Sequence, residues 1–351
     1  MKKPPGIIIT HSPAKSGKYI GSPSITVLPD GTYIASHDFF GPETPYTTNA
    51  ESVIFSSNDK GKLWRKISEI QPLFWGKLFV LNNKLYIIGT RHEYGDILIR
   101  RSDDGGKSWT KPNSHNSGLL KRGTFHCAPC KTLIHNNRLW RAFEVFTGGK
   151  WGNFNSLVIS APVDDDLLNA ESWSFSQPLP KQDNIEWLEG NALLDPEGNI
   201  VNILRTNENT EGKDKAAIVH VSSDGKKLSY EPKKDFIDMP GGGTKFTVRY
   251  NKKSKRYWAI VNKQTNPSAY RNNLILISSE NLRKWKVESQ LFFHPDKKKH
   301  GWQYVDWLFD NDNIVFVSRT AFNDEYGDAH NAHDANYLTF HRIKIPRTRS
   351  R

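Results

Sequence analysis

Cysteine is scarce in this sequence, which has only Cys127 and Cys130 among its 351 residues. A scaffold held together by several disulfides is therefore excluded, and packing must supply the stability. Long apolar runs are also absent, so no segment has the hydrophobic length that a membrane helix needs. Residues 1–17 begin with basic residues but contain only a very short apolar run, which is not a complete secretory signal. Two locations stay open: secreted or periplasmic after removal of a signal, or cytoplasmic.

Acidic residues are the minority charge, with 37 Asp and Glu against 49 Lys and Arg, which gives a net charge of +12 at pH 7. Such an excess favours an anionic partner. The lysine clusters at 251–255 and 296–300 have the composition of solvated turns rather than of one basic stripe, so nucleic acid is not the expected partner. The 11 Trp, 12 Tyr and 18 Phe favour many short strands and stacking against sugar rings.

One octet recurs along the chain. The stretches 57–64 (SNDKGKLW) and 102–109 (SDDGGKSW) share Ser, Asp, Gly and Trp at the first, third, fifth and eighth positions. A third copy at 278–285 (SSENLRKW) keeps the Ser and the Trp but has Glu280 and Leu282 between them. Looser copies occupy 222–230 and 161–173. Repetition of this kind indicates a repeat architecture.

Each octet follows a short apolar run and precedes another, which predicts strand, tight turn and strand. A second set of hairpins, with turns rich in Asp, Asn, Gly and Pro, alternates with the first set. This pattern predicts six units of four strands each. Their expected starts lie near Ser22, Trp75, His126, Glu189, Thr244 and Tyr304.

Six all-β units without a convincing amphipathic helix predict a single six-bladed β-propeller spanning residues 1–351. The last unit lacks its fourth strand, whereas an unassigned strand, GIIIT, stands near the start of the chain. We expect this N-terminal strand to close the ring, because closure removes an open sheet edge.

The octet has an expected structural role in this architecture. Its Asp accepts hydrogen bonds from the backbone of the turn, its Gly permits a strained conformation, and its Trp packs between neighbouring sheets. A calcium loop is the rival interpretation, but the octet lacks the oxygen ligands and the distal Glu of an EF-hand. We therefore interpret the octet as a structural element that stabilises its turn and the contact between neighbouring sheets.

The repeated Ser-x-Asp-x-Gly-x-x-Trp pattern resembles the Asp-box of sialidases and their relatives, and six such blades match the sialidase propeller over essentially the whole chain. This resemblance implies the fold and is poor evidence for activity, since the box also occurs in non-enzymes.

Propeller topology brings the start of each first strand and the end of each second strand to one face of the disc, around the axis. The first-strand starts contribute Trp75, His126, Glu189, Lys245, Tyr304 and Asp306. The second-strand ends contribute His37, Asp38, Arg91, His92, Glu144, Arg205, Asn262 and Arg319. So many polar groups at equivalent positions predict a binding or active site, although Asp306, between Tyr304 and Trp307, is expected to be structural.

Several of these positions follow the sialidase pattern. Glu189 and Arg205 resemble the glutamate and a carboxylate-binding arginine, and Tyr304 resembles the tyrosine nucleophile. Arg271 resembles a later arginine, and Asp38 the acid/base. Such chemistry is sensible, because a carboxylate that takes the phenolic proton activates the tyrosine, and guanidinium groups bind a substrate carboxylate bidentately.

One arm of the sialidase arginine triad is missing. Sialidases carry Arg-Ile-Pro on the first strand of the first blade, where this chain has GSP at 21–23, and no arginine precedes Arg65. Cleavage of sialic acid itself is therefore not implied. The expected substrate is another carboxylated or sulfated glycan, oriented by Arg205 and Arg271 with Arg91 or Arg319.

A second resemblance is to propeller lyases that act on ulvan or rhamnosyl-glucuronate. It rests on His126 and Arg205, which would act as base and carboxylate-neutralising group with Tyr304 as acid. The second histidine of those lyases is absent, with Glu144 nearby. A third hypothesis is a glycan-binding propeller without chemistry.

Two clusters raise the question of a metal. His330, His333 and Asp334 lie in one loop, but side chains that grip sugar hydroxyls are an equally good account. His126 adjoins Cys127 and Cys130, yet no fourth ligand is evident, and buried free thiols are the simpler interpretation. We expect no cofactor.

Overall fold

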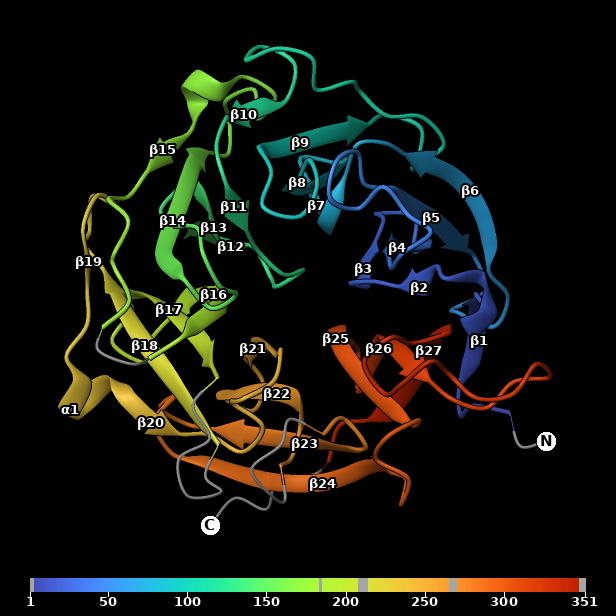
Figure 1. Cartoon of the computed structure of the whole chain (residues 1–351). Helices are drawn as coiled ribbons and strands as arrows, with labels where there is room; N and C mark the ends of the chain where they lie inside the picture. Colours follow the sequence, from blue (N-terminus) through green and yellow to red (C-terminus); the bar gives the residue numbers. More distant parts are fainter. Residues whose placement is uncertain (1–2, 183–184, 208–213, 265–269, 347–351) are drawn as a thin grey trace.

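Six antiparallel sheets surround a common axis, as Figure 1 shows. The computed structural model describes residues 3–182, 185–207, 214–264 and 270–346. Apart from strands, these residues form only three short helical segments: η1 (Ala14–Ser16), η2 (Ala170–Ser172) and α1 (Pro232–Asp235). The predicted six-bladed, all-β propeller is confirmed.

The first three blades follow the chain from the N-terminal side. Blade 1 contains β2 (Tyr19–Ile20), β3 (Ser24–Val27), β4 (Tyr33–Phe40), β5 (Ser52–Ser57) and β6 (Arg65–Ile70). Blade 2 contains β7 (Phe74–Leu81), β8 (Lys84–Thr90), β9 (Ile97–Ser102) and β10 (Leu119–Lys121). Blade 3 contains β11 (Phe125–His126), β12 (Leu133–His135), β13 (Arg138–Phe146), β14 (Phe154–Pro162) and β15 (Ser174–Phe175).

The other three blades complete the ring. Blade 4 contains β16 (Trp187–Leu194), β17 (Ile200–Thr206), β18 (Lys215–Val221), β19 (Leu228–Ser229) and β20 (Phe236–Asp238). Blade 5 contains β21 (Thr247–Asn251), β22 (Arg256–Asn262), β23 (Asn273–Ser279) and β24 (Trp285–Phe293). Blade 6 contains β25 (Gly301–Asp310), β26 (Asn313–Ala321), β27 (Tyr337–Lys344) and, at its outer edge, β1 (Ile7–His11).

The N-terminal strand closes the ring as predicted. β1 pairs antiparallel with β27, from Ile7 opposite Phe340 to His11 opposite Tyr337, and the two strands lie side by side in Figure 1. The His11 ring stacks on Tyr337 with 4.3 Å between ring centroids, and its Nε2 lies 2.8 Å from Asp324 Oδ2. The first strand of the chain therefore completes the last sheet, which joins the two ends of the fold.

The two perfect octets form the same turn. Asp59 Oδ1 accepts hydrogen bonds from the backbone N–H groups of Lys62 and Leu63, and Asp104 Oδ1 accepts them from Lys107 and Ser108. The glycines of both octets have positive φ angles, 87° at Gly61 and 96° at Gly106, which L-residues with side chains rarely adopt.

Their tryptophans reach the neighbouring blade. Trp64 Nε1 donates to Gly61 O and its ring packs against Phe340 of blade 6 at 5.4 Å between centroids. Trp109 Nε1 donates to Gly106 O and to Ser68 of blade 1. These contacts support the structural role expected for the octet.

The third octet uses a different residue from the expected one. Asn281, rather than Glu280, caps the turn by accepting from the N–H groups of Arg283 and Lys284. Leu282 takes the glycine position with a φ of 63°, and Trp285 Nε1 donates to its carbonyl. Glu280 points outward and pairs with Arg256. The third octet thus forms the same backbone turn as the first two, although the residue that caps it lies one position later.

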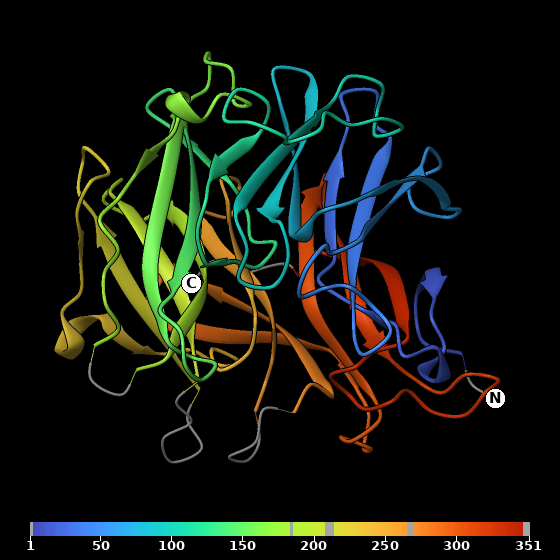
Figure 2. The ribbon, with the colours of Figure 1, turned by 45° about the horizontal axis from the view of Figure 1, so that its top comes forward.

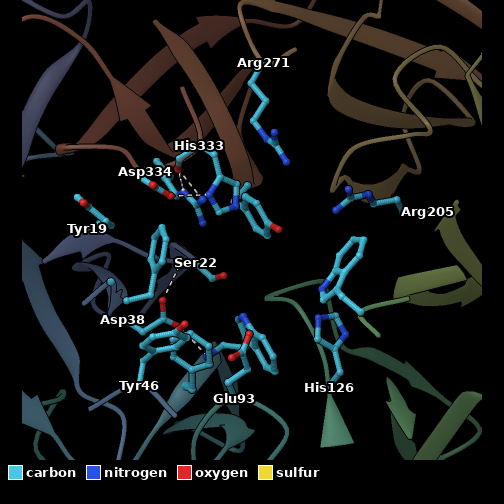
Figure 3. Close-up of a pocket in the computed structure, with 18 of the residues that line it drawn as sticks. Tyr19, Ser22, Asp38, Tyr46, Glu93, His126, Arg205, Arg271, His333 and Asp334 are labelled. Atoms are coloured by element: carbon cyan, nitrogen blue, oxygen red, sulfur yellow. Dashed lines mark hydrogen bonds and ion pairs between the residues drawn. The ribbon is translucent and has the colours of Figure 1, made fainter. Parts of the chain in front are cut away.

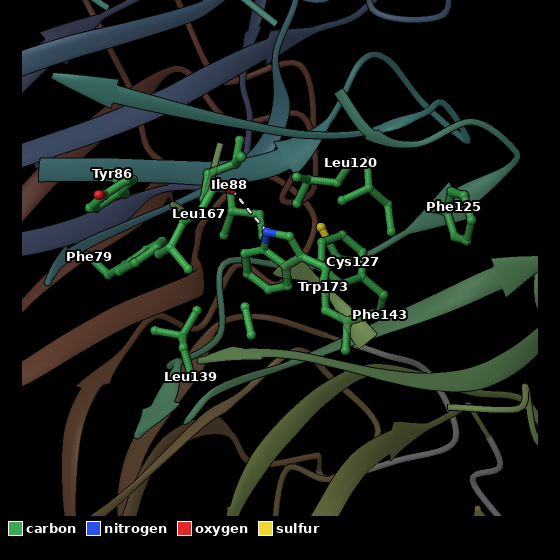
Figure 4. Close-up of a cluster of buried hydrophobic side chains, with 14 of the residues drawn as sticks. Phe79, Tyr86, Ile88, Leu120, Phe125, Cys127, Leu139, Phe143, Leu167 and Trp173 are labelled. Atoms are coloured by element: carbon green, nitrogen blue, oxygen red, sulfur yellow. Dashed lines mark hydrogen bonds between the residues drawn. The ribbon is translucent and has the colours of Figure 1, made fainter. Parts of the chain in front are cut away.

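Apolar side chains fill the space between adjacent blades. Figure 4 shows the largest such cluster, in which side chains of blades 2 and 3, including Phe79, Ile88, Leu139 and Phe143, surround Trp173. The indole Nε1 of Trp173 is buried but donates to Leu167 O at 2.9 Å. Each large apolar side chain buried in this way contributes about 1.5–3 kcal/mol, so contacts between blades hold the disc rigid around its axis.

Three inner strands share a bulge at the same place. The pairing register shifts between Phe74 and Lys77 in blade 2, between Leu188 and Asn191 in blade 4, and between Gln303 and Asp306 in blade 6. Each bulge contains a residue with a positive φ angle, and these are Trp75 (52°), Glu189 (57°) and Tyr304 (53°). Such strain in residues with side chains concentrates at functional sites.

Beneath the bulges, the axis is filled by a buried polar network. Asp306 is fully buried, and its carboxylate binds Lys77, Arg249, the Ser24 hydroxyl and the Ile25 N–H. Because every oxygen of Asp306 is engaged in joining blades 1, 2, 5 and 6, the structural role expected for it is supported.

Candidate active site

A cavity of about 1100 Å³ opens at the bulged ends of the inner strands. Side chains from all six blades line it, so its walls surround the axis on every side. Figure 2, in which the disc is turned, shows long loops on the same face of the ring. The predicted site residues that line it are Trp75, His126, Asp38, Arg205, Arg271, Tyr304, Arg319, His330 and His333.

Three guanidinium groups mark one part of the wall. Arg205, from β17, donates from Nε to Gly243 O and from Nη1 to Glu189 Oε2, both at 3.0 Å. Arg319, from β26, donates from Nε and Nη2 to His333 O. Arg271 lies just before β23, and burial lowers its pKa to about 10. Figure 3 shows Arg205 and Arg271 extending toward the same open space. Guanidinium groups that converge in this way have the charge and the paired donors that suit a carboxylate or sulfate.

Tyr304 lies among these arginines, with the Arg319 guanidinium 4.6 Å from its ring centroid. Burial raises the pKa of its phenol, as does the negative charge of Glu189, whereas Arg205, Arg319 and Arg271 oppose the increase. The phenol is therefore protonated at rest, and the surrounding cations stabilise the phenolate once a proton leaves.

Glu189 lies behind the cavity wall and does not line it. Only 2% of the residue is exposed, and its carboxylate forms an ion pair with Arg205. Burial alone would raise the pKa of Glu189, but Arg205, His126 and Lys245 more than offset this and lower it. The bulge thus holds a charged carboxylate behind the wall, paired with Arg205, and its negative charge acts on the Tyr304 phenol.

Asp38, near the end of β4, is a buried carboxyl in contact with the cavity. Its oxygens accept from the N–H groups of Ser22 at 2.6 Å and Trp75 at 2.5 Å. Burial raises its pKa to about 7, with these hydrogen bonds and Arg319 opposing the increase. A carboxyl with this pKa exchanges its proton near neutral pH, which suits a general acid/base.

Gly21, at the position where the sialidase pattern has arginine, leaves room for the Asp38 carboxyl group. A Cβ atom on Gly21 would lie 1.7 Å from Asp38 Oδ1, far inside van der Waals contact. No side chain fits there while Asp38 keeps this position. Arg319 instead brings a guanidinium group to the cavity from blade 6.

His126 forms a hydrogen-bonded pair with Glu144 of β13, with 2.7 Å between Nδ1 and Oε2. Glu144 is completely buried, and its other oxygen accepts from the Gly190 N–H at 3.0 Å. The imidazole lies against Phe154, at 4.6 Å between centroids, and against Trp75 at 4.4 Å. Glu144 is thus a support behind His126 rather than part of the cavity wall.

The loop after β26 supplies a third cluster. His330 and His333 each place Nδ1 2.7 Å from an oxygen of Asp334. The His330 ring stacks on Tyr19 at 5.1 Å, which fastens the loop over blade 1. Burial lowers the pKa of His333 to about 3, and Arg319 adds to this decrease. The loop therefore presents one carboxylate and two imidazoles at the rim.

Besides Glu189 and Glu144, five residues expected at the site do not line the cavity. Lys245 lies under the floor, where Nζ donates to Pro129 O, Thr247 Oγ1 and Val305 O. His37 is buried between Phe39 and Phe55. Arg91 pairs with Asp96 and lines a separate small cavity, while His92 Nδ1 lies against Glu93 O. Asn262 Nδ2 donates to Trp302 O.

These differences have local causes. After β8 the chain turns at Tyr94, whose φ is 55°, and this turn places Glu93 in the cavity wall instead of Arg91 and His92. In blade 5 the Lys245 amine is held by the carbonyls of Pro129 and Val305 and by the Thr247 hydroxyl, which keeps it out of the cavity.

The structure also reveals lining residues that the strand pattern missed. They come mainly from loops and from the first residues of blades: Tyr19, Ser22, Phe40, Tyr46, Phe74, Glu93, Trp151, Glu186, Asn207 and Gln264. Trp151 is 46% exposed and lies over the Arg205 guanidinium at 5.7 Å. Exposed aromatic rings beside a polar cavity are typical of sugar-binding surfaces. The richness of the sequence in aromatic residues was the one signal for the aromatic members of this set.

No group of three or more His, Cys, Asp or Glu residues is arranged to hold a metal within the described ranges. Cys127 and Cys130 are buried free thiols whose Sγ atoms lie near the carbonyls of Trp75 and Glu189. Burial raises the pKa of both thiols. None of the helices that the structure describes is long and apolar enough to cross a membrane.

No protein-family model matches the sequence, and no curated protein matches it in sequence. Solved structures nevertheless share its fold. A protein of unknown function from Dyadobacter fermentans is 14% identical, with a TM-score of 0.65 over 98% of this chain and 99% of that one. An α-L-arabinofuranosidase of Fusarium graminearum is 13% identical, with a TM-score of 0.61 over 96% and 97% of the two chains.

A sialidase of Trypanosoma rangeli is 16% identical, with a TM-score of 0.63 over 95% of this chain and 55% of that protein. The similarity extends over nearly all of the present sequence, and at these identities it concerns the fold. The chain is thus a six-bladed β-propeller of the architecture found in sialidases and in the Fusarium arabinofuranosidase.

Proposed function

We propose that this chain is an exo-acting glycoside hydrolase that cleaves an acidic glycan. The observation that carries the proposal is the grouping of Tyr304, backed by Glu189, with the guanidinium groups of Arg205, Arg271 and Arg319 in one cavity. A cavity enclosed by all six blades fits the end of a chain better than its middle, which supports the exo mode.

The substrate class follows from the charges. Three arginines line the cavity, and burial lowers the pKa of both Arg271 and Arg319. A bound carboxylate or sulfate would neutralise part of this buried positive charge and accept paired hydrogen bonds. The Fusarium and Trypanosoma proteins of the same fold are an arabinofuranosidase and a sialidase, which supports glycoside hydrolysis in general and does not select a sugar.

The proposed chemistry uses two steps. Tyr304 loses its proton to Glu189, and the phenolate oxygen attacks the anomeric carbon while the glycosidic bond breaks. Asp38 gives its proton to the leaving oxygen. In the second step Asp38 takes a proton from water, the hydroxide attacks the anomeric carbon, and the bond to Tyr304 breaks with return of the proton from Glu189 to the phenol oxygen.

A second candidate function is favoured by His126. Its contact with Glu144 and its position at the cavity suit the removal of a proton next to a uronate carboxylate, followed by β-elimination. In that reaction Arg205 would neutralise the carboxylate and Tyr304 would protonate the leaving oxygen. The third hypothesis is a propeller that binds a glycan without cleaving it, and the experiment must distinguish this outcome as well.

The experiment is incubation with sialosides, ulvan, rhamnose-capped glucuronans and sulfated galactans, followed by mass spectrometry and ultraviolet absorbance of the products. A product that contains the elements of water, formed by the wild type and lost in Tyr304→Phe, is expected. An unsaturated product lacking that water would replace the hydrolase with the lyase, and binding without any product would leave only a lectin-like role.

A further inference from the structure

Two hydrogen-bond acceptors in the cavity wall, the Glu93 carboxylate and the His126 imidazole, have no donor among the described residues. Glu93, in the loop after β8, is half-buried; within the described residues its carboxylate forms no hydrogen bond or close ion pair, and only His126 and His92 attract it electrostatically. Figure 3 shows Glu93 and His126 on the side of the cavity away from Arg271. A buried or half-buried acceptor without a donor is costly unless a ligand supplies one.

The Glu144 carboxylate determines which nitrogen of His126 faces the cavity. Its Oε1 already accepts from Gly190, and its Oε2 lies 2.7 Å from His126 Nδ1. A carboxylate can only accept here, so Nδ1 carries the hydrogen. In the neutral ring, Nε2 then has a lone pair. No described residue binds this atom, and His126 lines the cavity, so a ligand can reach it. His37 differs, because its Nε2 is fully enclosed by protein.

We propose that His126 Nε2 and the Glu93 carboxylate form an acceptor wall that binds two free hydroxyl groups of the substrate sugar. This inference rests on the proposed function and deepens it, because it divides the cavity into two halves. The anionic group of the sugar lies against Arg205, Arg271 and Arg319, and its hydroxyls lie against His126 and Glu93. Glu144 is a positioning residue that acts through His126.

The acceptor wall also excludes substrates. A sulfate at either of these hydroxyls would face the Glu93 carboxylate, with the Glu144 carboxylate behind His126, and would supply no donor. Heavily sulfated glycans are therefore poor substrates, and sugars with one anionic group and free hydroxyls are good ones. Burial raises the pKa of Glu93, and hydroxyl donors bound to it would lower that pKa again.

The first test is the tautomer of His126, measured by ¹⁵N NMR of the full-length protein with labelled histidine. We expect a protonated Nδ1 and an unprotonated Nε2 in the wild type. In Glu144→Gln the amide can donate to Nδ1, and the hydrogen should move to Nε2. Asp334→Asn is the matched control, because it removes the carboxylate from His330 and His333 and should leave the His126 signals unchanged.

The second test is binding, followed through the same Nε2 signal, with D-glucuronate and N-acetylneuraminic acid as probes. We expect at least one sugar to shift Nε2 and to bind about 10-fold more weakly to Glu93→Ala. O-methylation of its hydroxyls should abolish the shift. An Nε2 that is protonated in the free protein, or one that neither sugar moves, overturns the proposal.

The two proposals fail separately. If the sugars move Nε2 but no glycan is cleaved, the acceptor wall stands and the hydrolase does not. If a glycan is hydrolysed but its O-methylated form binds as well as the free form, the hydrolase stands and the acceptor wall does not. A folded Glu144→Gln protein is identified by an unchanged melting profile and by unchanged His330 and His333 signals.

Discussion

The guanidinium group of Arg319 lies between two aromatic rings, 4.6 Å from the centroid of Tyr304 and 4.6 Å from that of Phe40. Two of its nitrogens donate to His333 O, so the group is fixed in position before a ligand binds. A planar cation stacked on the proposed nucleophile can stabilise phenolate character there and can still present its remaining N–H groups to an anion.

Replacement of this cation tests the anion site. Arg319→Lys keeps the charge but loses the stacked plane and the paired donors, so we expect KM to rise about 10-fold or more for an anionic glycan. Steady-state kinetics measures the change, and Arg91→Lys, which lies outside the cavity, is the matched control. Equal KM values for both variants would argue against a role of Arg319 in anion binding.

Tyr304 and Glu189 should act as one unit. Tyr304→Phe removes the attacking oxygen, and Glu189→Gln removes the charge that receives its proton, so each should lower kcat by about 100-fold or more. The double variant should be little worse than either single one. The measurement is kcat on the glycan found in the substrate panel, and a fully active Tyr304→Phe enzyme would rule out the nucleophile.

Activity should decline as the pH rises through neutrality. Burial raises the pKa of Asp38 to about 7, and a general acid delivers a proton only while it is protonated. We expect kcat to fall above about pH 7 with a single ionisation, and Asp38→Asn to lower activity and remove this limb of the profile. A profile of the same shape in Asp38→Asn would assign the ionisation to another group.

The same group should make stability depend on pH. Because the pKa of Asp38 is raised on folding, the folded chain binds this proton more tightly than the unfolded chain. Its contribution to stability is complete below about pH 4 and is lost as the pH rises through about 7. At about 1.4 kcal/mol per pKa unit, urea unfolding at pH 5 and pH 8 should differ less in Asp38→Asn than in the wild type.

The octets should matter for stability and not for turnover. Asp104→Ala removes a cap with several donors, and we expect a loss of about 1–2 kcal/mol in the free energy of unfolding with kcat unchanged. Asn281→Ala should behave similarly in the third octet, whereas Glu280→Ala removes only an exposed partner and should cost less than about 0.5 kcal/mol. Denaturant titrations distinguish these values, and a larger effect for Glu280→Ala would contradict the observed cap.

Periodic features were predictable from the sequence, and loop features were not. The octets and the alternating hairpin turns are local patterns, so they predicted six blades and closure by the N-terminal strand. The third octet shows the limit, because its letters favoured Glu280 whereas the backbone uses Asn281. The positions of Trp75, Tyr304 and Arg205 followed from topology alone.

The rest of the site depends on geometry that one sequence does not display. The positive φ at Glu189 and Tyr304 comes from bulges whose cost is met by packing around them. Glu93 and Trp151 reach the cavity through loop conformations that are independent of strand register. Lys245 was expected there, but its amine donates to the carbonyls of Pro129 and Val305 instead.

The bulges at Trp75, Glu189 and Tyr304 also bear on how such a protein can change over time. Three of the six blades carry such a bulge, and in each of them the strand resumes its antiparallel pairing on both sides of the strained residue. A single substitution can therefore exchange an aromatic platform, an acid or a nucleophile in one sector of the ring and leave the other five sectors intact. The architecture lets new specificities arise one blade at a time.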